Sequence, residues 1–373
     1  MMRHTGGRAI SDKQQELVLW LNTLVLAIAC GFIARRSPTA SSACEEFNCC
    51  DAMVFRGVGN LLVTGEPNVY DWNQLAAWWG GISGTAPSIV LPFAYPPPFL
   101  PYFELWGVWD PQFVVVGIAV LSLLLYRSAI SRLAGPMVAL VACAGGWTFF
   151  NAFLGQTGLL VATGGVLVAL GLSKNPRALL PGLILLSLKP HYALYTLVGL
   201  VLSGRWKPVA QTAAVGALLS VWVTFRYGTT QWMGWIEAIT EELGGSHPSL
   251  DFEHMSGWIT LLPAGKPELA PLATLLFFLG LVPIAMAWNR LSPTRALGVS
   301  LALACLLSPH AHPYDLGLWV VPAIATWKEP TKPVLGLGLL VLITCSLGFR
   351  FPLAIASAWL TWQCWRSQSS QAN

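Results

Sequence analysis

The chain has 373 residues, of which 55% are hydrophobic and only 10% are charged, and its mean hydropathy is +0.60. A soluble globular domain carries about 25% charged residues, so this chain lacks the polar coat that a water-soluble protein needs. Its net charge of +4 is small and gives no reason to expect a nucleic-acid partner. The composition therefore predicts an all-α polytopic membrane protein.

The chain begins with a polar, basic stretch that precedes its first apolar run. Residues 1–16 contain Arg3, Arg8 and Lys13, and Leu17–Ala34 is long enough to span a bilayer. A basic start followed by an apolar run is also typical of a cleaved signal peptide. Because Arg35-Arg36 follows at once and further apolar runs come later, an uncleaved membrane anchor is the preferred interpretation.

A large polar segment, residues 35–98, follows this anchor. Asp51–Thr64 places Val54, Val58, Leu61 and Leu62 at helical spacing, and Trp72–Trp79 is short and aromatic. Both pieces predict amphipathic helices that lie at the membrane surface, where tryptophan and tyrosine concentrate. Ile89–Trp109 is apolar but contains five prolines, which favours a re-entrant or broken segment over a straight span.

The eight cysteines divide between apolar and polar surroundings. Cys44, Cys49 and Cys50 lie in the first polar segment, where Cys44 can pair with either of the other two if that segment faces an oxidising compartment. Their spacing is not that of a zinc site, so no metal is predicted. The others fall in apolar runs and are expected to be inert core residues: Cys30, Cys143, Cys305, Cys345 and Cys364.

The rest of the chain reads as a series of apolar runs in a single integral-membrane domain, residues 1–373. With the first helix they predict a bundle of about 12 transmembrane helices, within a range of 10 to 13. A second large polar loop is predicted at residues 227–257. The predicted spans are Phe113–Tyr126, Met137–Phe153, Gly158–Leu172, Ala178–Leu188, Tyr192–Leu202, Val209–Phe225, Leu269–Trp288, Ala296–Leu307, Leu316–Trp327, Val334–Leu347 and Pro352–Trp365.

The distribution of charge predicts the topology. With both termini in the cytoplasm, 14 of the 21 basic residues fall on the cytoplasmic side, as the positive-inside rule requires. The short basic loops Ser173–Arg177 and Gly204–Pro208 are the clearest examples. The polar features that basic loops do not explain then share the outer side: Asp51, Tyr95-Pro96-Pro97, Gly155-Gln156, Lys189-Pro190-His191, the 227–257 loop and the segment from His310 to Asp315.

The order of these features resembles glycosyltransferase family 87 of the GT-C superfamily. An acidic residue opens an amphipathic helix after the first span, and the later motifs end with a Ser-Pro…Tyr-Asp stretch at Ser308 to Asp315. The resemblance extends from Asp51 to Asp315 and implies an inverting membrane transferase with a polyprenyl-phosphate sugar donor. It also implies a catalytic acid in the first outer loop, which by position is Asp51. Many GT-C proteins have paired acids in this loop, whereas here only Glu45-Glu46 are paired.

Sugar transfer to a hydroxyl needs a base for the acceptor proton and a partner for the phosphate that leaves. Asp51 is the predicted base, although it also suits a helix cap, and Glu45, Glu46 and the acids of Glu237–Glu253 remain alternatives. No cofactor is expected beyond the lipid-linked donor, and the partners are that donor, a lipid or glycan acceptor and the membrane. The predicted donor-phosphate and substrate residues are Lys189, His191, His310, His312, Gln156, Tyr95 and Asp315.

The predicted function is transfer of a hexose or pentose, mannose among them, at the extracytoplasmic face of a bacterial cytoplasmic membrane. A transporter or lipid flippase is the main alternative, and a non-catalytic membrane scaffold is the third. Transporters typically have related halves and ionisable groups near the bilayer midplane. This chain has no internal repeat, and its unexplained charges gather on one predicted side, which favours the transferase.

Overall fold

The structure is a computed structural model that describes residues 12–35, 51–83, 93–244, 270–308 and 311–326. These residues contain helices and no strands. In chain order the helices are α1 (Asp12–Arg35), α2 (Asp51–Thr64), α3 (Trp72–Ser83), η1 (Pro97–Phe99), α4 (Leu100–Val108), α5 (Pro111–Ala134), α6 (Pro136–Cys143), α7 (Gly146–Leu154), α8 (Gly158–Ser173), η2 (Pro176–Ala178), α9 (Leu179–Leu186), α10 (Pro190–Leu202), α11 (Trp206–Tyr227), α12 (Thr230–Gly244), α13 (Ala270–Leu279), α14 (Leu281–Arg290), α15 (Pro293–Leu307), η6 (Pro313–Trp319) and α16 (Val320–Thr326).

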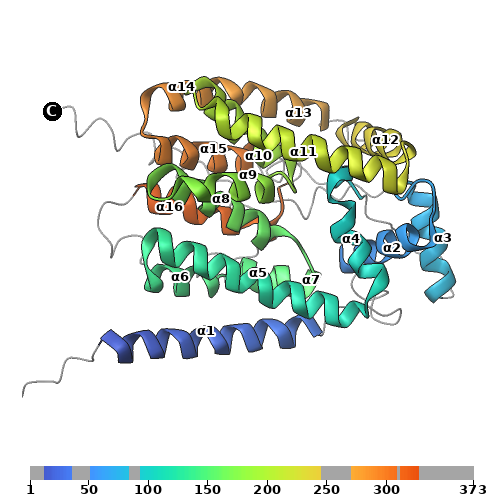
Figure 1. Cartoon of the computed structure of the whole chain (residues 1–373), viewed down its shortest axis with the longest axis horizontal. Coiled ribbons are helices and arrows are strands. Elements are labelled where there is room, and N and C mark those ends of the chain that lie inside the picture. The colour runs from blue at the N-terminus through green and yellow to red at the C-terminus, as the bar shows by residue number, and fades with distance from the viewer. Residues whose placement is uncertain (1–11, 36–50, 84–92, 245–269, 309–310, 327–373) are drawn as a thin grey trace, which may run out of the picture.

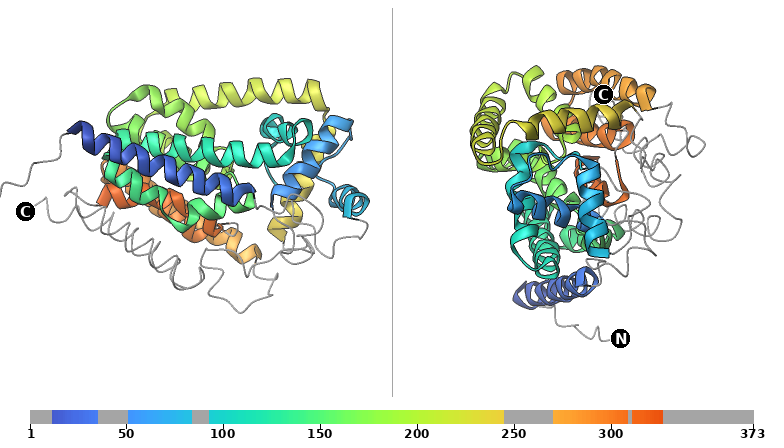
Figure 2. Two further views of the ribbon diagram at one scale, coloured as in Figure 1. Left: turned by 90° about the horizontal axis from the view of Figure 1, so that it is seen from below. Right: turned by 90° about the vertical axis from the view of Figure 1, so that its right-hand side faces the viewer.

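The helices form an elongated bundle with a smaller group of helices at one end. α2, α3, α4 and α12 gather at the right-hand end of Figure 1, where the long helices α1, α5 and α11 end. The left view of Figure 2 shows the same end group from below. α2 and α3, which belong to the first polar segment, therefore cover one end of the bundle.

Proline and glycine set many of the helix boundaries. α5, α6, α10 and α15 each begin with a proline at the first helical position, where the missing N–H costs no hydrogen bond. Asp110 caps α5 by accepting a hydrogen bond from the backbone N–H of Gln112 at 2.8 Å. Gly155 ends α7 with a φ of 69°, a conformation that suits glycine. The chain therefore turns sharply between helices at positions that the sequence marks.

Two predicted spans are broken in the structure, and each break has a local cause. The span predicted over Met137–Phe153 divides into α6 and α7, which are bent by 54°. A β-carbon at Gly145 would lie 2.4 Å from the Trp147 ring, so this bend requires glycine. The span predicted over Leu269–Trp288 divides at Gly280, where a β-carbon would lie 2.2 Å from the Tyr195 hydroxyl oxygen.

Other predicted elements agree more closely with the structure. Asp51–Thr64 forms α2 with the predicted bounds, and the predicted Trp72–Trp79 helix continues to Ser83. The described part of Ile89–Trp109 is a short 3-10 turn followed by α4, so it is a broken helical segment as expected. The 227–257 segment contains α12. The predicted spans Val334–Leu347 and Pro352–Trp365 lie outside the described residues, as do all the cysteines except Cys30, Cys143 and Cys305, which are buried and free.

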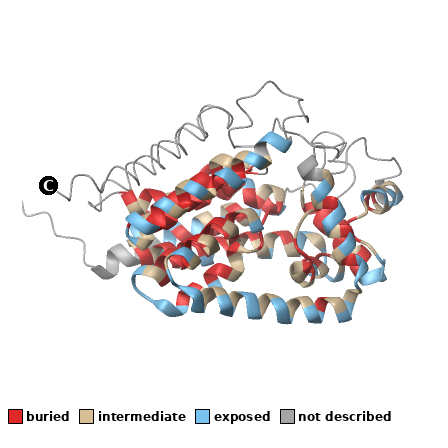
Figure 3. Ribbon diagram, turned by 90° about the horizontal axis from the view of Figure 1, so that it is seen from above, coloured by how far each residue is buried: buried red, intermediate tan, exposed pale blue. Residues whose placement is uncertain are grey.

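Apolar helices make the fold consistent with a membrane protein. Among the described residues, α5 and α11 are long and apolar enough to cross a bilayer, and α6 with α7 adds a third candidate if the bent pair counts as one span. Several other apolar helices are shorter, so the twelve crossings stay a prediction. Figure 3 shows buried residues along the bundle interior and mostly exposed or intermediate residues along α11, where Val223 is the buried residue.

The basic loops lie at the opposite end of the bundle from α2, α3 and α4 (Figure 1). The Lys174 ammonium, which follows α8, donates to the backbone oxygens of Arg132 at 3.4 Å and Leu133 at 2.6 Å. This contact holds together two loops that the positive-inside rule assigns to the same side. The chain thus has a basic end and an end that carries the acidic and aromatic polar segment.

A backbone contact between two glycines fixes α2 against α4. A β-carbon at Gly107 would lie 2.2 Å from the Gly59 carbonyl oxygen, and one at Gly59 would lie 2.4 Å from the Phe103 carbonyl oxygen. The obstructing atoms are backbone, so they have no side-chain rotamer with which to move aside. The close approach also buries Phe55 and Val58 of α2. The position of Asp51 therefore depends on two glycines that are eight and 56 residues away in sequence.

We predict that Gly107→Ala destabilises the protein by about 1–3 kcal/mol, because the added methyl group overpacks the α2–α4 contact. Thermal unfolding in detergent measures the effect. Gly117→Ala on α5 is the matched control, since a β-carbon there meets nothing within 4 Å and alanine is the better helix former. Equal melting temperatures for the two variants would contradict the proposed role of the glycine contact.

Candidate functional site

Asp51 is the first residue of α2, and it lies where the end group meets the bundle. An acidic side chain at this position interacts favourably with the positive end of the helix dipole. The four residues that follow, Ala52 to Phe55, are buried, while Asp51 itself keeps intermediate exposure. The helix is thus held along its length and its carboxylate end reaches the site.

The Gly155-Gln156 turn meets Asp51 from the bundle side. A β-carbon at Gly155 would lie 3.0 Å from the β-carbon of Ala52, which shows how closely the turn approaches the start of α2. The Gln156 side chain hydrogen-bonds the Asp51 carboxylate. Glycine in the left-handed conformation permits both the turn and this approach. Two motifs that are about a hundred residues apart in the sequence are therefore in contact.

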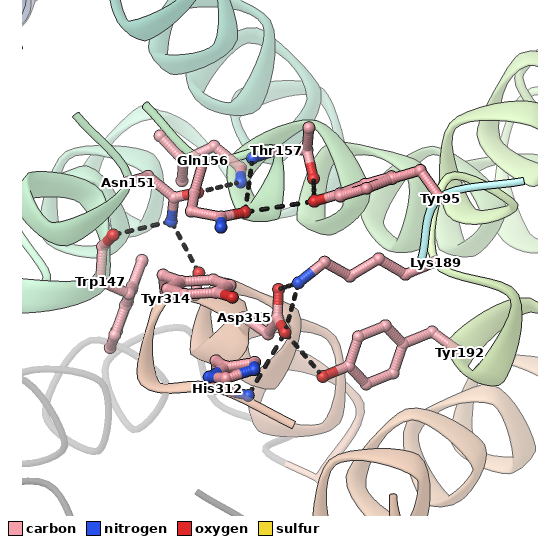
Figure 4. A network of polar contacts seen from close by, with 11 residues as sticks. Tyr95, Trp147, Asn151, Gln156, Thr157, Lys189, Tyr192, His312, Tyr314 and Asp315 are labelled. Carbon is pink, nitrogen blue, oxygen red and sulfur yellow. Dashed lines mark hydrogen bonds and ion pairs between the residues drawn. The ribbon is translucent and has the colours of Figure 1, made fainter. Parts of the chain in front are cut away.

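Tyr95 joins the same group from the proline-rich segment. Its hydroxyl donates to the Gln156 side-chain oxygen at 3.2 Å and shares a 2.8 Å hydrogen bond with the Thr157 hydroxyl. Figure 4 shows the Tyr95 side chain pointing at the Gln156–Thr157 turn. The Tyr70 hydroxyl donates to the Tyr95 backbone oxygen at 2.8 Å, which fixes the segment from the side of α3.

Lys189 and Asp315 form a buried ion pair in the same region. The Lys189 ammonium lies 2.8 Å from both Asp315 carboxylate oxygens, and the two side chains are 9% and 1% exposed. The Tyr192 hydroxyl donates to Asp315 at 3.0 Å, and the His312 backbone N–H donates to it at 3.4 Å. Figure 4 shows the Asp315 carboxylate between Lys189 and Tyr192. Lys189, which the sequence suggested as a phosphate-binding cation, is thus already paired with the Asp315 carboxylate.

Local structure explains where these two charges lie. Lys189 precedes Pro190 at the start of α10, so it lies at the turn that follows α9 rather than within a helix. Asp315 lies in the first turn of η6. The Asn151 side chain donates to the Tyr314 backbone oxygen at 2.6 Å and accepts from the Leu159 N–H at 3.1 Å. Asn151 therefore ties η6 to the α7–α8 turn that carries Gln156.

Aromatic rings surround the ion pair. The Lys189 ammonium lies 4.5 Å from the centre of the Tyr314 ring, and this ring stacks on His312 at 4.9 Å with an angle of 11°. His191 packs on Tyr192 with their ring centres 4.1 Å apart. A cation over an aromatic face is stabilised by the ring quadrupole. His312 and His191 thus lie on the two tyrosines that contact the ion pair.

The surroundings of Asp51 shift the pKa of its carboxyl in both directions. Burial raises the pKa of the Asp51 carboxyl above its ordinary value, and the nearby Asp315 charge adds to this rise. The Gln156 hydrogen bond and the Lys189 charge lower that pKa. A carboxylate in this balance can accept a proton more readily than an exposed aspartate does. The acidic and basic side chains of the cluster are Asp51, Lys189 and Asp315.

The structure brings together most of the predicted site residues but not all of them. Asp51, Tyr95, Gln156, Lys189 and Asp315 form one polar cluster, and His191 and His312 border it. His310, Glu45, Glu46 and Glu253 lie outside the described residues. Glu237 is exposed on α12. Among the described residues, no group of three histidines, cysteines or acids is arranged to hold a metal ion.

Three residues of the cluster were not predicted: Asn151, Thr157 and Tyr192. Asn151 is a polar residue within an apolar run, which is itself a signal of an interhelical or site role in a membrane protein. Tyr192 follows Lys189 by three residues, a spacing that places two side chains on the same face of a helix. Thr157 is adjacent to the Gly-Gln motif. The sequence features of these three residues were visible, but they are not specific to a functional site.

Comparison with known proteins identifies a family. The model of glycosyltransferase family 87 matches residues 93–309 of the chain. The matched region contains Tyr95, Gln156 and Lys189, whereas Asp51 lies 42 residues before its start and Asp315 lies six residues after its end. No curated protein and no solved structure matches the chain.

We predict that Lys189→Met lowers the free energy of unfolding by about 3–5 kcal/mol, because it leaves the Asp315 charge buried without its cation. The double variant Lys189→Met with Asp315→Leu should recover most of this loss, since no buried charge remains. Thermal and denaturant unfolding of both variants measure the coupling. If Asp315→Leu lowers stability as much in the Lys189→Met protein as it does in the wild type, the two side chains are not coupled.

Proposed function

Because the chain belongs to glycosyltransferase family 87, we propose that it transfers a sugar from a polyprenyl-phosphate donor to a hydroxyl of a lipid or glycan acceptor. The sugar is a hexose or pentose, with mannose among the candidates. The reaction inverts the anomeric carbon and needs no metal or cofactor. Its setting is a GT-C-like bundle in a bacterial cytoplasmic membrane, with 35–98 and 227–257 as extracytoplasmic segments and both chain ends in the cytoplasm.

The observation that carries this proposal is the Asp51 carboxylate beside Gln156 and the buried Lys189–Asp315 pair. In the proposed step the acceptor oxygen attacks the anomeric carbon, and the bond from that carbon to the phosphate oxygen breaks. The polyprenyl phosphate leaves with the bonding electron pair, and Asp51 takes the acceptor proton. A base with a raised pKa suits this role, because it holds the proton more firmly at neutral pH.

The leaving phosphate needs hydrogen-bond donors or positive charge. Lys189 is the buried cation of the described cluster, and Asp315 orients it with both carboxylate oxygens. We therefore assign Lys189 to the phosphate and Asp315 to the orientation of Lys189. His191 and His312 adjoin the tyrosines that surround this pair and are the next candidate donors. This assignment keeps the residues predicted from the sequence and gives Asp315 a more specific part.

The two-ended charge distribution supports an extracytoplasmic site. The basic loops after α5 and α8 lie together at one end, and α2, which begins with Asp51, lies at the other (Figure 1). By the positive-inside rule the basic end faces the cytoplasm. The donor's lipid chain would then lie in the outer leaflet, with its sugar phosphate at the level of Lys189 and Asp51.

We predict that Asp51→Asn slows sugar transfer at least about a hundredfold, because an amide keeps the shape and the helix cap but cannot take a proton. Purified protein in nanodiscs, incubated with a panel of polyprenyl-phosphate sugars and acceptors, gives the rate by mass spectrometry. Donor binding should persist. The rate of the wild-type enzyme should fall at low pH as Asp51 becomes protonated, with a midpoint above the pKa of an ordinary aspartate of about 3.9.

Asp110→Asn is the matched control for this experiment, since Asp110 also begins a helix but is exposed and caps α5 through a local hydrogen bond. It should transfer sugar at the wild-type rate. Near-normal transfer by Asp51→Asn would move the base to Glu45, Glu46 or the acids of the 227–257 segment.

The sidedness generates a separate prediction. In protein whose Cys44, Cys49 and Cys50 are replaced by serine, an impermeant maleimide added outside should label Asn73→Cys and spare Asn175→Cys. Both positions are exposed, and they lie on the α3 end and the basic end respectively. Asn175→Cys should react once the membrane is permeabilised. The same labelling of both positions in sealed cells would refute the one-sided arrangement.

A further inference from the structure

The Tyr95 hydroxyl lies at the start of a short chain of hydrogen bonds that ends at Asp51. It contacts the Thr157 hydroxyl at 2.8 Å and donates to the Gln156 side-chain oxygen at 3.2 Å. The Gln156 side chain in turn hydrogen-bonds the Asp51 carboxylate. Because a hydroxyl has one proton and Tyr95 gives it to Gln156, the Thr157 hydroxyl is the donor in its own contact with Tyr95. The direction of donation thus runs from Thr157 through Tyr95 and Gln156 to Asp51.

The direction of these hydrogen bonds fixes the orientation of the Gln156 side-chain amide. Its oxygen accepts from the Tyr95 hydroxyl and from the Thr157 backbone N–H at 3.3 Å. A backbone N–H can only donate, so a rotated amide would place two donors against each other. The amide oxygen therefore faces Tyr95 and Thr157, and the amide NH2 group faces the Asp51 carboxylate. A donor held in this way stabilises the ionised form of a carboxylate.

The Tyr95 ring is held firmly enough to orient a neighbour. It lies 5.5 Å from the Phe55 ring in an edge-to-face contact and 4.8 Å from the Phe103 ring. Phe55 follows Asp51 by four residues on α2, so the helix that carries the carboxylate also packs on Tyr95. Burial raises the pKa of the Tyr95 hydroxyl well above its ordinary value, and the group consequently keeps the proton that it donates.

We propose that Tyr95 is a positioning residue for Asp51 and acts through Gln156, an assignment that rests on the proposed role of Asp51 as the base. In this arrangement Tyr95 does not need to touch the sugar or the phosphate. Its hydroxyl fixes the orientation of the Gln156 amide, and the amide in turn holds the Asp51 carboxylate by a hydrogen bond. The Tyr95-Pro96-Pro97 motif thus links the end group that carries Asp51 to the bundle turn that carries Gln156.

The charged groups that face Asp51 determine the sign of the expected change. Lys189, from the α9–α10 turn, favours the carboxylate, and Asp315, from η6, opposes it. Tyr95→Phe leaves both charges in place and removes one donor to Gln156. The Gln156 amide then donates less firmly to Asp51, and the pKa of Asp51 rises. Gln156→Leu removes the last donor of the chain, so its effect has the same direction and is larger.

The test reads the protonation of Asp51 without any substrate. Infrared difference spectra of the protein in nanodiscs, recorded against pH, give the Asp51 titration as the carboxyl signal that Asp51→Asn removes. Tyr95→Phe should move this titration to higher pH, and Gln156→Leu should move it further. In Gln156→Leu protein, the added Tyr95→Phe change should produce no further movement, because the intermediate link is already missing.

Tyr102→Phe is the matched control, since Tyr102 also packs on Phe103, whereas the hydroxyl that hydrogen-bonds Gln156 and Thr157 is that of Tyr95. Its Asp51 titration should equal that of the wild type. An unchanged titration in Tyr95→Phe, or an additive movement in the double variant, overturns the proposal. If the titrations behave as expected but wild-type protein transfers no sugar from any donor in the panel, the positioning role stands and the proposed function fails.

Discussion

The buried pair of Lys189 and Asp315 is the interaction on which the arrangement of the site depends. Isolated charges in an apolar bundle are costly, so each of these side chains requires the other. The two residues are separated by 126 positions, and they come from the α9–α10 turn and from η6. The pair therefore fixes where these segments meet. Tyr192, the His312 backbone and the Tyr314 ring complete its surroundings.

The carboxylates of Asp51 and Asp315 have different partners. Asp315 has a cation at 2.8 Å from each oxygen, whereas Asp51 has an amide from Gln156 and only the longer-range charge of Lys189. Both oxygens of Asp315 are already engaged by the Lys189 ammonium, whereas Asp51 has no cation among the described residues in direct contact and keeps intermediate exposure at the site. This contrast, rather than proximity alone, separates the proposed base from the proposed orienting residue.

The sequence was informative where the structure depends on local pattern, and less so where it depends on tertiary contact. Apolar spacing and an acidic start predicted α2 with its observed bounds. Lys189 was singled out as a charge between two apolar runs, and Asp315 as part of a polar turn on the same predicted side. Neither pattern predicts that the two residues pair, since pairing depends on the path of the chain between them. The apolar run Met137–Phe153 gave no sign of the bend at Gly145, where the Trp147 ring leaves no room for a β-carbon. Tyr192 lies in an apolar run, where its hydroxyl is indistinguishable from an ordinary core tyrosine.

The cluster joins two parts of the molecule that are positioned by different forces. α2 is held by the glycine contact with α4 and by the aromatic packing of Phe55 with Tyr95 and Phe103. Gln156 is held by the α7–α8 turn, which Asn151 ties to η6 and hence to the ion pair. The contact between Asp51 and Gln156 exists only when the end group is docked on the bundle. A change that loosens the α2–α4 contact would consequently alter the environment of the carboxylate without touching any polar residue. In the proposed mechanism, proton acceptance at Asp51 would therefore depend on the packing of this apolar interface, and the glycine contact between α2 and α4 would support the site from a distance.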